Sequence, residues 1–408
     1  MLVNAPPEFP PIGYLVPEFP SQTHAFFWRE VRGMREAGQE VHLLSTRRPS
    51  DDACRHEWAE EARTETTYVH PPRWFSAVGW MIGHPVQTVK ALRYVAGLKE
   101  TRFSERMKIL GMALPAAELA RTSVELGLTH VHVHSCANAA HLAALAHCLG
   151  APRYSLTLHG DLPVYGTDHA SKMGGATFVS TVTRPLQGQV TEQVGLPSER
   201  VPVIWMGVDT QHFRPPAQPR RKPRGKPLVL STIARLNETK GHVHALRALR
   251  VALDEGCELE YRIAGEGPHR NEIEAEIERL GLEDHVTLLG SISEEEVRGL
   301  LDASHAFCLP SFGLGEAAPV SVMEAMACGL PVICSIIGGT RDMIDHDVDG
   351  LLCEQQDEEA LAEAFTRIAR EPATRRRLGQ AARDRAVDEF DYRRVSFRLL
   401  GEIRSAAA

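Results

Sequence analysis

The chain alternates short apolar runs with amphipathic stretches along most of its length. Ile12 to Val16 is an apolar run typical of a buried strand, and Thr23 to Glu36 repeats apolar residues at helical spacing. Gln39 to Ser45 then predicts a second strand. Strand, helix and strand at this spacing indicate the start of a doubly wound α/β domain with a parallel sheet.

The same alternation continues through both halves of the sequence. The further strands that it predicts are 130–134, 154–158, 176–181, 201–204, 228–233, 261–264, 286–289 and 307–309. The further helices are 138–149, 184–194, 242–253, 271–280, 358–370, 373–389 and 392–405, and a capping box stands at Ser293 to Glu296.

The length of the chain indicates two domains, because 408 residues exceed what one hydrophobic core organises. Residues 214–227 contain proline and basic residues and no acid, as expected of an exposed connector, so a hinge is predicted near 210–226. We therefore expect domains at 1–212 and 213–390, followed by a returning helix at 391–408.

Composition narrows the class of protein. With 43% hydrophobic and 24% charged residues the chain is typical of a globular protein, and its net charge of −8 argues against bulk nucleic-acid binding. The eight cysteines are scattered without a C-x-x-C pair, which favours reduced thiols in the cytoplasm. No apolar run is long enough to cross a bilayer, and residues 1–11 lack the features of a signal peptide.

The most informative stretch is Glu316 to Gly329, which reads E-A-A-P-V-S-V-M-E-A-M-A-C-G. Pro319 suits the first turn of a helix, and the amides of Val320 and Ser321 would then face outward as an anion site. Glu316 stands before this site and Glu324 lies eight residues later, where carboxylates can accept from vicinal hydroxyls. An ordinary helix with one glutamate near its start and another on its surface is the alternative.

Two cations lie five residues apart in the loop after the predicted strand 228–233. Arg235 offers a planar fork and Lys240 a point charge, so both can bind one diphosphate. A solvated charge pair is the alternative interpretation. Gly265 and Gly267 form a glycine turn after the strand 261–264, which is weak evidence when taken alone.

Taken together, these segments resemble motifs of the retaining glycosyltransferases of family 4, which have the GT-B fold: E-x(7)-E, G-R-x-x-x-x-K-G and G-x-G-P. The resemblance implies two Rossmann-like doubly wound domains facing a central cleft, with the final helix crossing back to the first domain. It also implies that Glu316 contacts donor-sugar hydroxyls, that Glu324 holds the ribose, and that Arg235 and Lys240 bind the diphosphate. The remaining donor-binding residues would be Gly265, Gly267, Ala317, Ala318, Pro319 and Val320.

Three positions depart from the family pattern. Ala234 and Ala317 replace glycines, and Asp342 replaces a glutamate in G-G-x-x-E. If position 317 needs a positive φ, alanine is costly there and the sugar subsite is shaped differently.

In the first half, Phe19 to Thr23 resembles the F-P-x-x-S-x-T-F loop of exopolysaccharide enzymes of family 4, with His24 in place of phenylalanine. The loop follows the first strand, where ligands of such sheets collect. A Ser/Thr cap for the next helix is the alternative. His159 follows the strand 154–158, and the resemblance implies that it faces the donor sugar across the cleft. The acceptor-binding residues are predicted as Ser21, Gln22, Thr23 and Asp161.

Two patterns raise the question of a metal. His130, His132 and His134 share one face of a strand, but three parallel imidazoles need ligands from elsewhere to form a tetrahedral centre, so we interpret them as partly buried structural residues. Asp347 and Asp349 precede a glycine in what reads as a surface turn. We therefore predict a metal-independent enzyme with no metal site and no cofactor.

Residues 71–110 combine aromatics such as Trp74 and Phe75 with seven cations against two acids. One hypothesis is a helical surface that contacts anionic lipid or a lipid-linked acceptor on the inner face of the membrane. The alternative is two ordinary helices whose cations extend around an apolar face.

These expectations combine into one function, a retaining hexosyltransferase that uses a nucleotide-diphosphate sugar, with UDP favoured and GDP second. The acceptor would be a hydroxyl, favoured as a lipid-linked saccharide in polysaccharide assembly. Since no carboxylate stands out as a nucleophile, front-face substitution is expected. The alternatives are a GT-B nucleotide-sugar epimerase or hydrolase, and a non-catalytic regulator that binds a nucleotide sugar.

Overall fold

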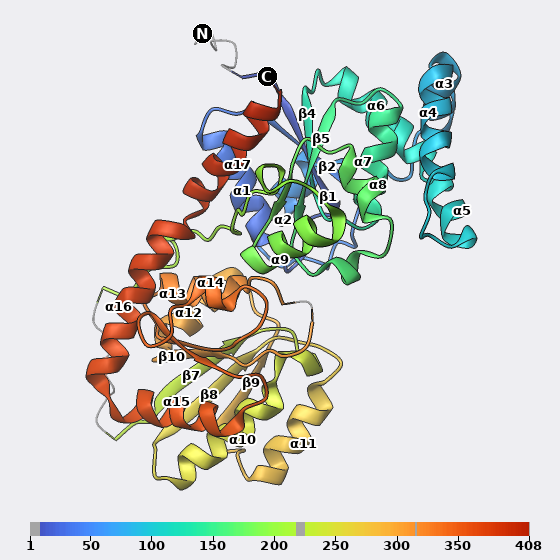
Figure 1. The fold of residues 1–408 in the computed structure, drawn as a ribbon. Helices are drawn as coiled ribbons and strands as arrows, with labels where there is room; N and C mark the ends of the chain where they lie inside the picture. Colours follow the sequence, from blue (N-terminus) through green and yellow to red (C-terminus); the bar gives the residue numbers. More distant parts are fainter. Residues whose placement is uncertain (1–8, 218–224, 315, 408) are drawn as a thin grey trace. The chain divides into compact units, whose positions relative to one another are not determined.

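A computed structural model describes residues 9–217, 225–314 and 316–407 of the chain. The chain divides into two compact units, Met1–Trp205 with Arg393–Ala408, and Met206–Tyr392 (Figure 1). Within the described residues, no helix combines the length and the apolar character that crossing a membrane requires.

The first unit is built on a parallel sheet in the order β3-β2-β1-β4-β5-β6. Its strands are β1 (Ile12–Glu18), β2 (Val41–Arg47), β3 (Thr67–Tyr68), β4 (His130–His134), β5 (Arg153–Leu158) and β6 (Val179–Thr181). Its helices are α1 (Ala25–Glu36), α2 (Ala59–Glu65), α3 (Trp74–Gly83), α4 (Pro85–Ala96), α5 (Phe103–Gly111), α6 (Ala113–Glu125), α7 (Asn138–Cys148), α8 (His169–Gly174), α9 (Arg184–Gln189) and α17 (Tyr392–Ala407), with short turns η1 (Leu162–Tyr165), η2 (Val190–Val194) and η3 (Ser198–Arg200).

The second unit repeats this topology in the order β12-β11-β10-β7-β8-β9. Its strands are β7 (Leu228–Ile233), β8 (Leu259–Ala264), β9 (Val286–Gly290), β10 (Ala306–Leu309), β11 (Val332–Ser335) and β12 (Gly350–Cys353). Its helices are α10 (His242–Asp254), α11 (Arg270–Leu280), α12 (Glu294–Ala303), α13 (Val320–Ala327), α14 (Thr340–Met343), α15 (Glu358–Arg370) and α16 (Pro372–Glu389), with the turn η4 (Glu238–Lys240). Leu230, Leu246, Tyr261, Ile263 and Phe365 lie in its buried core.

The strand order places one switch point in each unit. The chain turns outward in opposite directions from β1 and β4 in the first sheet, and from β7 and β10 in the second. Ligands of doubly wound sheets bind outside the carboxyl ends of the strands at this point. The predicted doubly wound fold is confirmed in both units.

The boundary at Trp205 and Met206 lies before the predicted 212/213 boundary, for a physical reason. The amide of Val208 donates to the Phe390 carbonyl at 2.8 Å, and the amide of Tyr392 donates to the Val208 carbonyl at 2.9 Å. A Cβ at Gly207 would lie 2.5 Å from Tyr392 Cα, so glycine permits this approach. These contacts tie residues 207 and 208 to the second unit. Of the predicted connector, residues 218–224 lie outside the described part of the chain.

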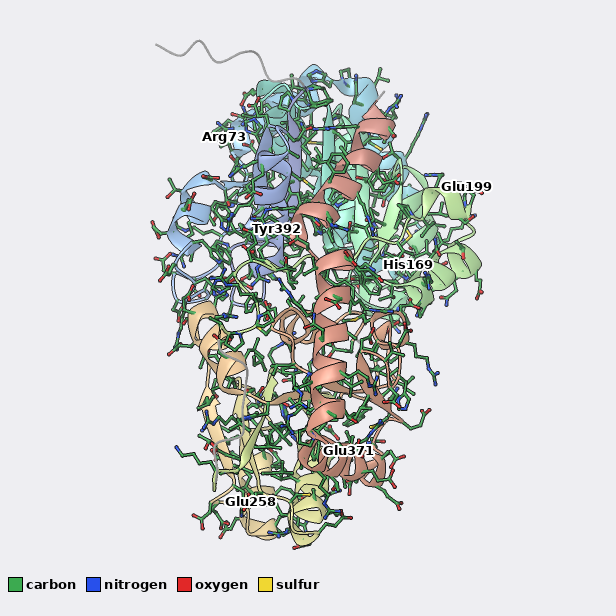
Figure 2. The ribbon with its side chains drawn as sticks, turned by 90° about the vertical axis from the view of Figure 1, so that its left-hand side faces the viewer. Arg73, His169, Glu199, Glu258, Glu371 and Tyr392 are labelled. Carbon is green, nitrogen blue, oxygen red and sulfur yellow. The ribbon has the colours of Figure 1, made fainter. Side chains whose placement is uncertain are left out.

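The last helix belongs to the first unit, as the family resemblance implied. Helix α17 starts at Tyr392, which Figure 2 labels. The hydroxyl of Ser396 donates to the Glu30 carbonyl at 3.1 Å, and Arg393 Nε lies 3.0 Å from Glu36 Oε2.

Several local predictions differ from the structure. Residues 201–204 form an isolated bridge, Thr181 to Val203, instead of a strand. The helix expected at 184–194 is α9 followed by a π-turn at Val190–Val194. Residues 71–110 hold the three helices α3, α4 and α5 instead of two. The capping box at Ser293 and Glu296 is confirmed.

Candidate functional site

The loops on either side of the second switch point bring Lys240 and Glu316 into contact. The Lys240 ammonium forms an ion pair with Glu316 Oε2, and the Ser311 hydroxyl donates to the same oxygen at 3.1 Å. Lys240 follows β7, whereas Ser311 and Glu316 follow β10. Within the part of the chain that the structure describes, both contacts use Oε2, which leaves the lone pairs of Oε1 for a hydroxyl donor.

Backbone contacts hold the two loops against each other. The Phe312 amide donates to the Thr239 carbonyl at 2.8 Å. Gly241 has a φ of +72°, and a Cβ there would lie 2.0 Å from the Pro310 carbonyl oxygen. Glycine at 241 is therefore required both by its conformation and by the proximity of the second loop.

A glycine also supports the backbone of Glu316. Gly338 has a φ of +52°, and a Cβ there would lie 1.9 Å from the Glu316 carbonyl oxygen. The Gly339 amide donates to the Ala317 carbonyl at 2.7 Å. Ala317 is not among the described non-glycine residues that have a positive φ, so the alanine there carries no such strain.

Helix α13 begins one residue later than predicted. Pro319 is its N-cap, with φ −71° and ψ 115°, instead of a residue of the first turn. The Pro319 carbonyl accepts from the amides of Val322 and Met323 at 3.1 and 3.4 Å. The proline still suits this place, because the amides that an α-helix leaves without internal partners start after it. The amides of Val320 and Ser321 therefore remain candidates for an anion.

The second glutamate of the motif lies inside the protein. Glu324 on α13 is only 8% exposed, which excludes the alternative of a surface glutamate. The proximity of Glu324 to Arg235 and Lys240 stays a prediction, as does the contact of Glu324 with a ribose.

Arg235 lies on the loop after β7 with its side chain exposed. Among residues 9–217, 225–314 and 316–407, its guanidinium has no ion-pair partner. Its carbonyl accepts from the Asn237 amide at 2.9 Å and lies 3.1 Å from His242 Nε2. The backbone of Arg235 is thus fixed while its cation faces solvent.

The glycine turn after β8 packs on the same loop. A Cβ at Gly265 would lie 1.8 Å from the Ala234 carbonyl oxygen, and one at Gly267 would lie 2.4 Å from that of Leu236. The Leu236 amide donates to the Glu266 carbonyl at 3.0 Å. These glycines therefore let one loop pack on the other, a role that the sequence did not reveal.

In the first unit, His159 follows β5 and lies against α1. Its Nε2 lies 2.9 Å from His134 Nδ1, and its ring packs against Phe26 and Phe27 at centroid distances of 5.3 and 5.5 Å. Burial lowers the pKa of His159 well below its usual range, so the ring is neutral near pH 7.

The predicted acceptor residues are mostly engaged in local structure. Gln22 Oε1 accepts from the Arg55 amide at 2.9 Å, and Asp161 Oδ1 accepts from Gln189 Nε2 at 2.7 Å. Helix α1 starts after His24, whose side chain makes no cap bond, so the alternative of a Ser/Thr cap by Ser21 or Thr23 is wrong. Thr23 is exposed.

A cavity of about 420 Å³ lies at the switch point of the first unit, and sequence reasoning missed it. Ser135, which follows β4, has a φ of +132°. Such strain in a non-glycine residue often accompanies function, but sequence alone does not show it. The lining residues lie at the ends of β1, β2 and β4 and on α6 and α7, and include Pro17, Thr46, Arg47, Ser135, Asn138 and Leu142.

The two aspartates considered as metal ligands form ion pairs with arginines. Asp347 Oδ1 pairs with Arg367 and Arg377 at 2.7 and 2.9 Å. Asp349 is buried, contrary to the expected surface turn, and its Oδ2 lies 2.7 Å from Arg385 Nε. His132 and His134 lie with Glu30 such that their ligand atoms fall within 4.8 Å of one another.

Helices α3, α4 and α5 gather at one edge of the first unit (Figure 1). Their apolar side chains include Phe75 at 96% exposure and Phe103 at 79%. Of the cations in this region, Arg73, labelled in Figure 2, pairs with Glu118 at 2.7 Å, and Lys108 pairs with Glu105 at 2.7 Å. The surface is thus apolar and exposed, with a part of its charge neutralised locally.

Residues 214–385 match the protein family described as Glycosyl transferases group 1. The chain therefore contains a glycosyl transferases group 1 domain. This domain contains the Lys240 and Glu316 pair, Arg235, Glu324 and Gly338, whereas His159 and the loop at Ser21 lie before it.

Curated relatives extend the similarity beyond this group 1 domain. The chain is 35% identical over 214 residues to the amylovoran biosynthesis glycosyltransferase AmsK of Erwinia amylovora. This match covers 52% of this chain and 52% of the relative. It is 36% identical over 184 residues to the putative colanic acid biosynthesis glycosyltransferase WcaL of Escherichia coli, covering 43% of this chain and 45% of the relative. In these two comparisons the chain matches about half the length of the relative. With WcaL of Salmonella typhimurium the identity is 24%, over 95% of this chain and 98% of the relative.

Solved structures are similar over the whole chain. Anabaena HepE in complex with UDP and glucose superposes with a TM-score of 0.73 at 16% identity, covering 97% of this chain and 100% of that one. Sucrose-phosphate synthase from Thermosynechococcus elongatus has a TM-score of 0.72 at 18% identity, over 97% and 99% of the two chains. At these identities the similarity shows the fold, which is GT-B, with a group 1 domain as its second unit.

Proposed function

We propose that this protein is a retaining glycosyltransferase that moves a hexosyl group from a nucleotide-diphosphate sugar to a hydroxyl acceptor. The observation that supports this most is the Lys240 and Glu316 pair at the switch point of a group 1 domain, with the exposed cation of Arg235 on the same loop as Lys240. UDP is the favoured nucleotide of the donor, because HepE, a protein with the same fold, was solved with UDP. GDP is the second candidate.

In the proposed reaction, charge builds on the departing diphosphate as the bond to the sugar breaks. Arg235 and Lys240 stabilise this charge, helped by the first-turn amides of α13 near Val320. A lysine ammonium has three N–H donors, so Lys240 can keep its contact with Glu316 while it binds a phosphate oxygen. Glu316 Oε1 accepts from a hydroxyl of the donor sugar. Glu324 holds the ribose and His159 orients the sugar, in line with the family resemblance.

The acceptor is proposed as a lipid-linked saccharide in exopolysaccharide assembly. The role in exopolysaccharide assembly is supported by the names of AmsK and WcaL, which assign those relatives to amylovoran and colanic acid biosynthesis. The lipid-linked nature of the acceptor is supported by the exposed apolar surface of α3, α4 and α5. This surface suits contact with an anionic lipid surface while the protein stays peripheral and cytoplasmic. The proposed contacts with the acceptor are made by Ser21, Gln22, Thr23 and Asp161.

Donor turnover across UDP-, GDP- and ADP-sugars tests the proposal. We expect one nucleotide to be released fastest, and release to accelerate when a lipid-linked saccharide is added. Release that no acceptor changes would favour a hydrolase or epimerase, and absence of release with tight nucleotide-sugar binding would favour a regulator. The same assay tests metal independence, since activity lost in EDTA and restored by manganese would contradict it.

A further inference from the structure

Ser311 lies beside the ion pair of Lys240 and Glu316, two residues after the end of β10. Its side chain is only 1% exposed, and its hydroxyl donates to Glu316 Oε2 at 3.1 Å. A buried hydroxyl needs a hydrogen-bond acceptor, and this carboxylate oxygen supplies one. Because the protein covers Ser311 almost completely, a bound donor contacts Glu316 but not the serine. Ser311 can therefore act on a donor only through Glu316.

The backbone on both sides of Ser311 is fixed to the loop after β7. The Phe312 amide donates to the Thr239 carbonyl at 2.8 Å. The Pro310 carbonyl oxygen packs so closely on Gly241 that a Cβ there would lie 2.0 Å from it. A serine side chain has one rotatable bond before its hydroxyl, and close packing restricts that bond to few rotamers. The Ser311 hydroxyl therefore holds the carboxylate oxygen from a fixed position.

Lys240 holds the same oxygen in a different way. Its side chain is 20% exposed, and a flexible four-carbon stem carries the ammonium. In the proposed reaction this ammonium also binds a phosphate oxygen of the donor, so Lys240 divides its N–H donors between the phosphate and Glu316. The hydroxyl of Ser311 has a single proton to donate, and Glu316 accepts it. When a donor is bound, Ser311 is thus the contact that keeps the carboxylate from turning.

We propose that Ser311 is a positioning residue for the transfer reaction: its hydroxyl holds Oε2 of Glu316, so that Oε1 faces the sugar of the bound donor. The identity of the donor rests on the proposed function, whereas the contact between the two side chains does not. The competing explanation is that the serine only fills space in a packed loop. In that case its removal would change the stability of the protein and leave the binding of the sugar unchanged.

The contact is tested without any ligand, by crystal structures of the wild type and of Ser311→Ala. We expect one orientation of the Glu316 carboxylate in the wild type, with Oε2 on the Ser311 hydroxyl, and two or more orientations in the variant. Ser231→Ala is the matched control, since Ser231 is fully buried on β7 and its hydroxyl has no hydrogen-bond partner among the described residues. The control should leave Glu316 in one orientation. A wild-type hydroxyl on another acceptor, or an unmoved carboxylate in Ser311→Ala, would overturn the proposal.

The effect on the donor is measured by calorimetric titration with UDP-glucose and with UDP. Ser311→Ala should weaken the binding of UDP-glucose about tenfold, the effect of losing one hydrogen bond, and leave the binding of UDP unchanged, because Glu316 contacts only the sugar. Ser231→Ala should change neither. Equal losses for the two ligands in Ser311→Ala would assign a merely structural role and overturn the proposal. A wild type that binds neither ligand contradicts the proposed UDP-sugar donor, while the crystal structures still decide the contact.

A double-mutant cycle shows whether Ser311 acts through Glu316. In a Glu316→Ala background, Ser311→Ala should cause no further loss of UDP-glucose binding, because the carboxylate that the hydroxyl holds is gone. The same tenfold loss in that background would show that the serine acts elsewhere, and the proposal would be wrong. If Ser311→Ala does not fold, Ser311→Cys takes its place, since a thiol is a weak donor, and it should weaken the binding of UDP-glucose but not of UDP.

Discussion

The Lys240 ammonium contacts the Glu316 carboxylate, although 76 positions separate the two residues along the chain. Each lies on a loop that follows a strand beside the switch point of the second sheet. The contact joins a cation suited to a diphosphate with an acid suited to sugar hydroxyls, which are the two halves of a nucleotide-sugar donor.

Glu316→Gln should lower donor turnover by about a hundredfold, because the amide cannot match the carboxylate as an acceptor for sugar hydroxyls and for Lys240. The measurement is kcat with a saturating sugar nucleotide. Glu238→Gln is the control, since Glu238 is exposed on the same loop as Lys240. Full turnover in Glu316→Gln would contradict the assigned role.

Gly338→Ala should destabilise the protein by about 1–3 kcal/mol and reduce activity, because the new Cβ meets the Glu316 carbonyl oxygen at a positive φ. Gly299→Ala on α12 is the matched control, as its Cβ would meet no atom within 4 Å. There, alanine should stabilise by about 0.5–1 kcal/mol. Urea unfolding measures both changes, and equal signs would count against the packing argument.

Phe75→Glu should weaken binding to vesicles of anionic lipid about tenfold, because the phenylalanine would no longer bury its ring in the lipid interface. Phe397→Glu changes an equally apolar side chain that is 65% exposed on α17, and should leave binding unchanged. Flotation with anionic and with neutral vesicles measures the bound fraction. A wild type that fails to float with anionic vesicles would remove the proposed membrane contact.

Acid should destabilise the folded protein between about pH 6.5 and pH 4. Burial lowers the pKa of His130 and of His242 to about 4, so the unfolded chain takes up protons in this range that the folded chain does not. Stability therefore rises with pH across this window, by up to about 1.4 kcal/mol per pH unit for each such histidine. Urea unfolding at several pH values checks this, and His130→Gln should show a shallower loss than the wild type.

The sequence was sufficient for what depends on neighbours along the chain. Period-two and continuous apolar runs predicted β4 and β7 with their observed bounds, since a strand needs only a local pattern and a sheet to join. The positions of Arg235, Lys240, Glu316 and Glu324 also came from local motifs. The N-cap role of Pro319 was missed by one residue, because the start of a helix depends on ψ, which proline does not restrict as it does φ.

Contacts between distant segments were decided only by the tertiary structure. The need for glycine at 265 and 338 comes from carbonyl groups of other loops, and residues 207 and 208 join the second unit through hydrogen bonds to residues 390 and 392. The row of histidines on β4 gave no sign that His134 lies between Glu30 and His159. Strand periodicity shows which face a side chain takes, whereas its partner depends on which helix and which turn the folded chain places over that face.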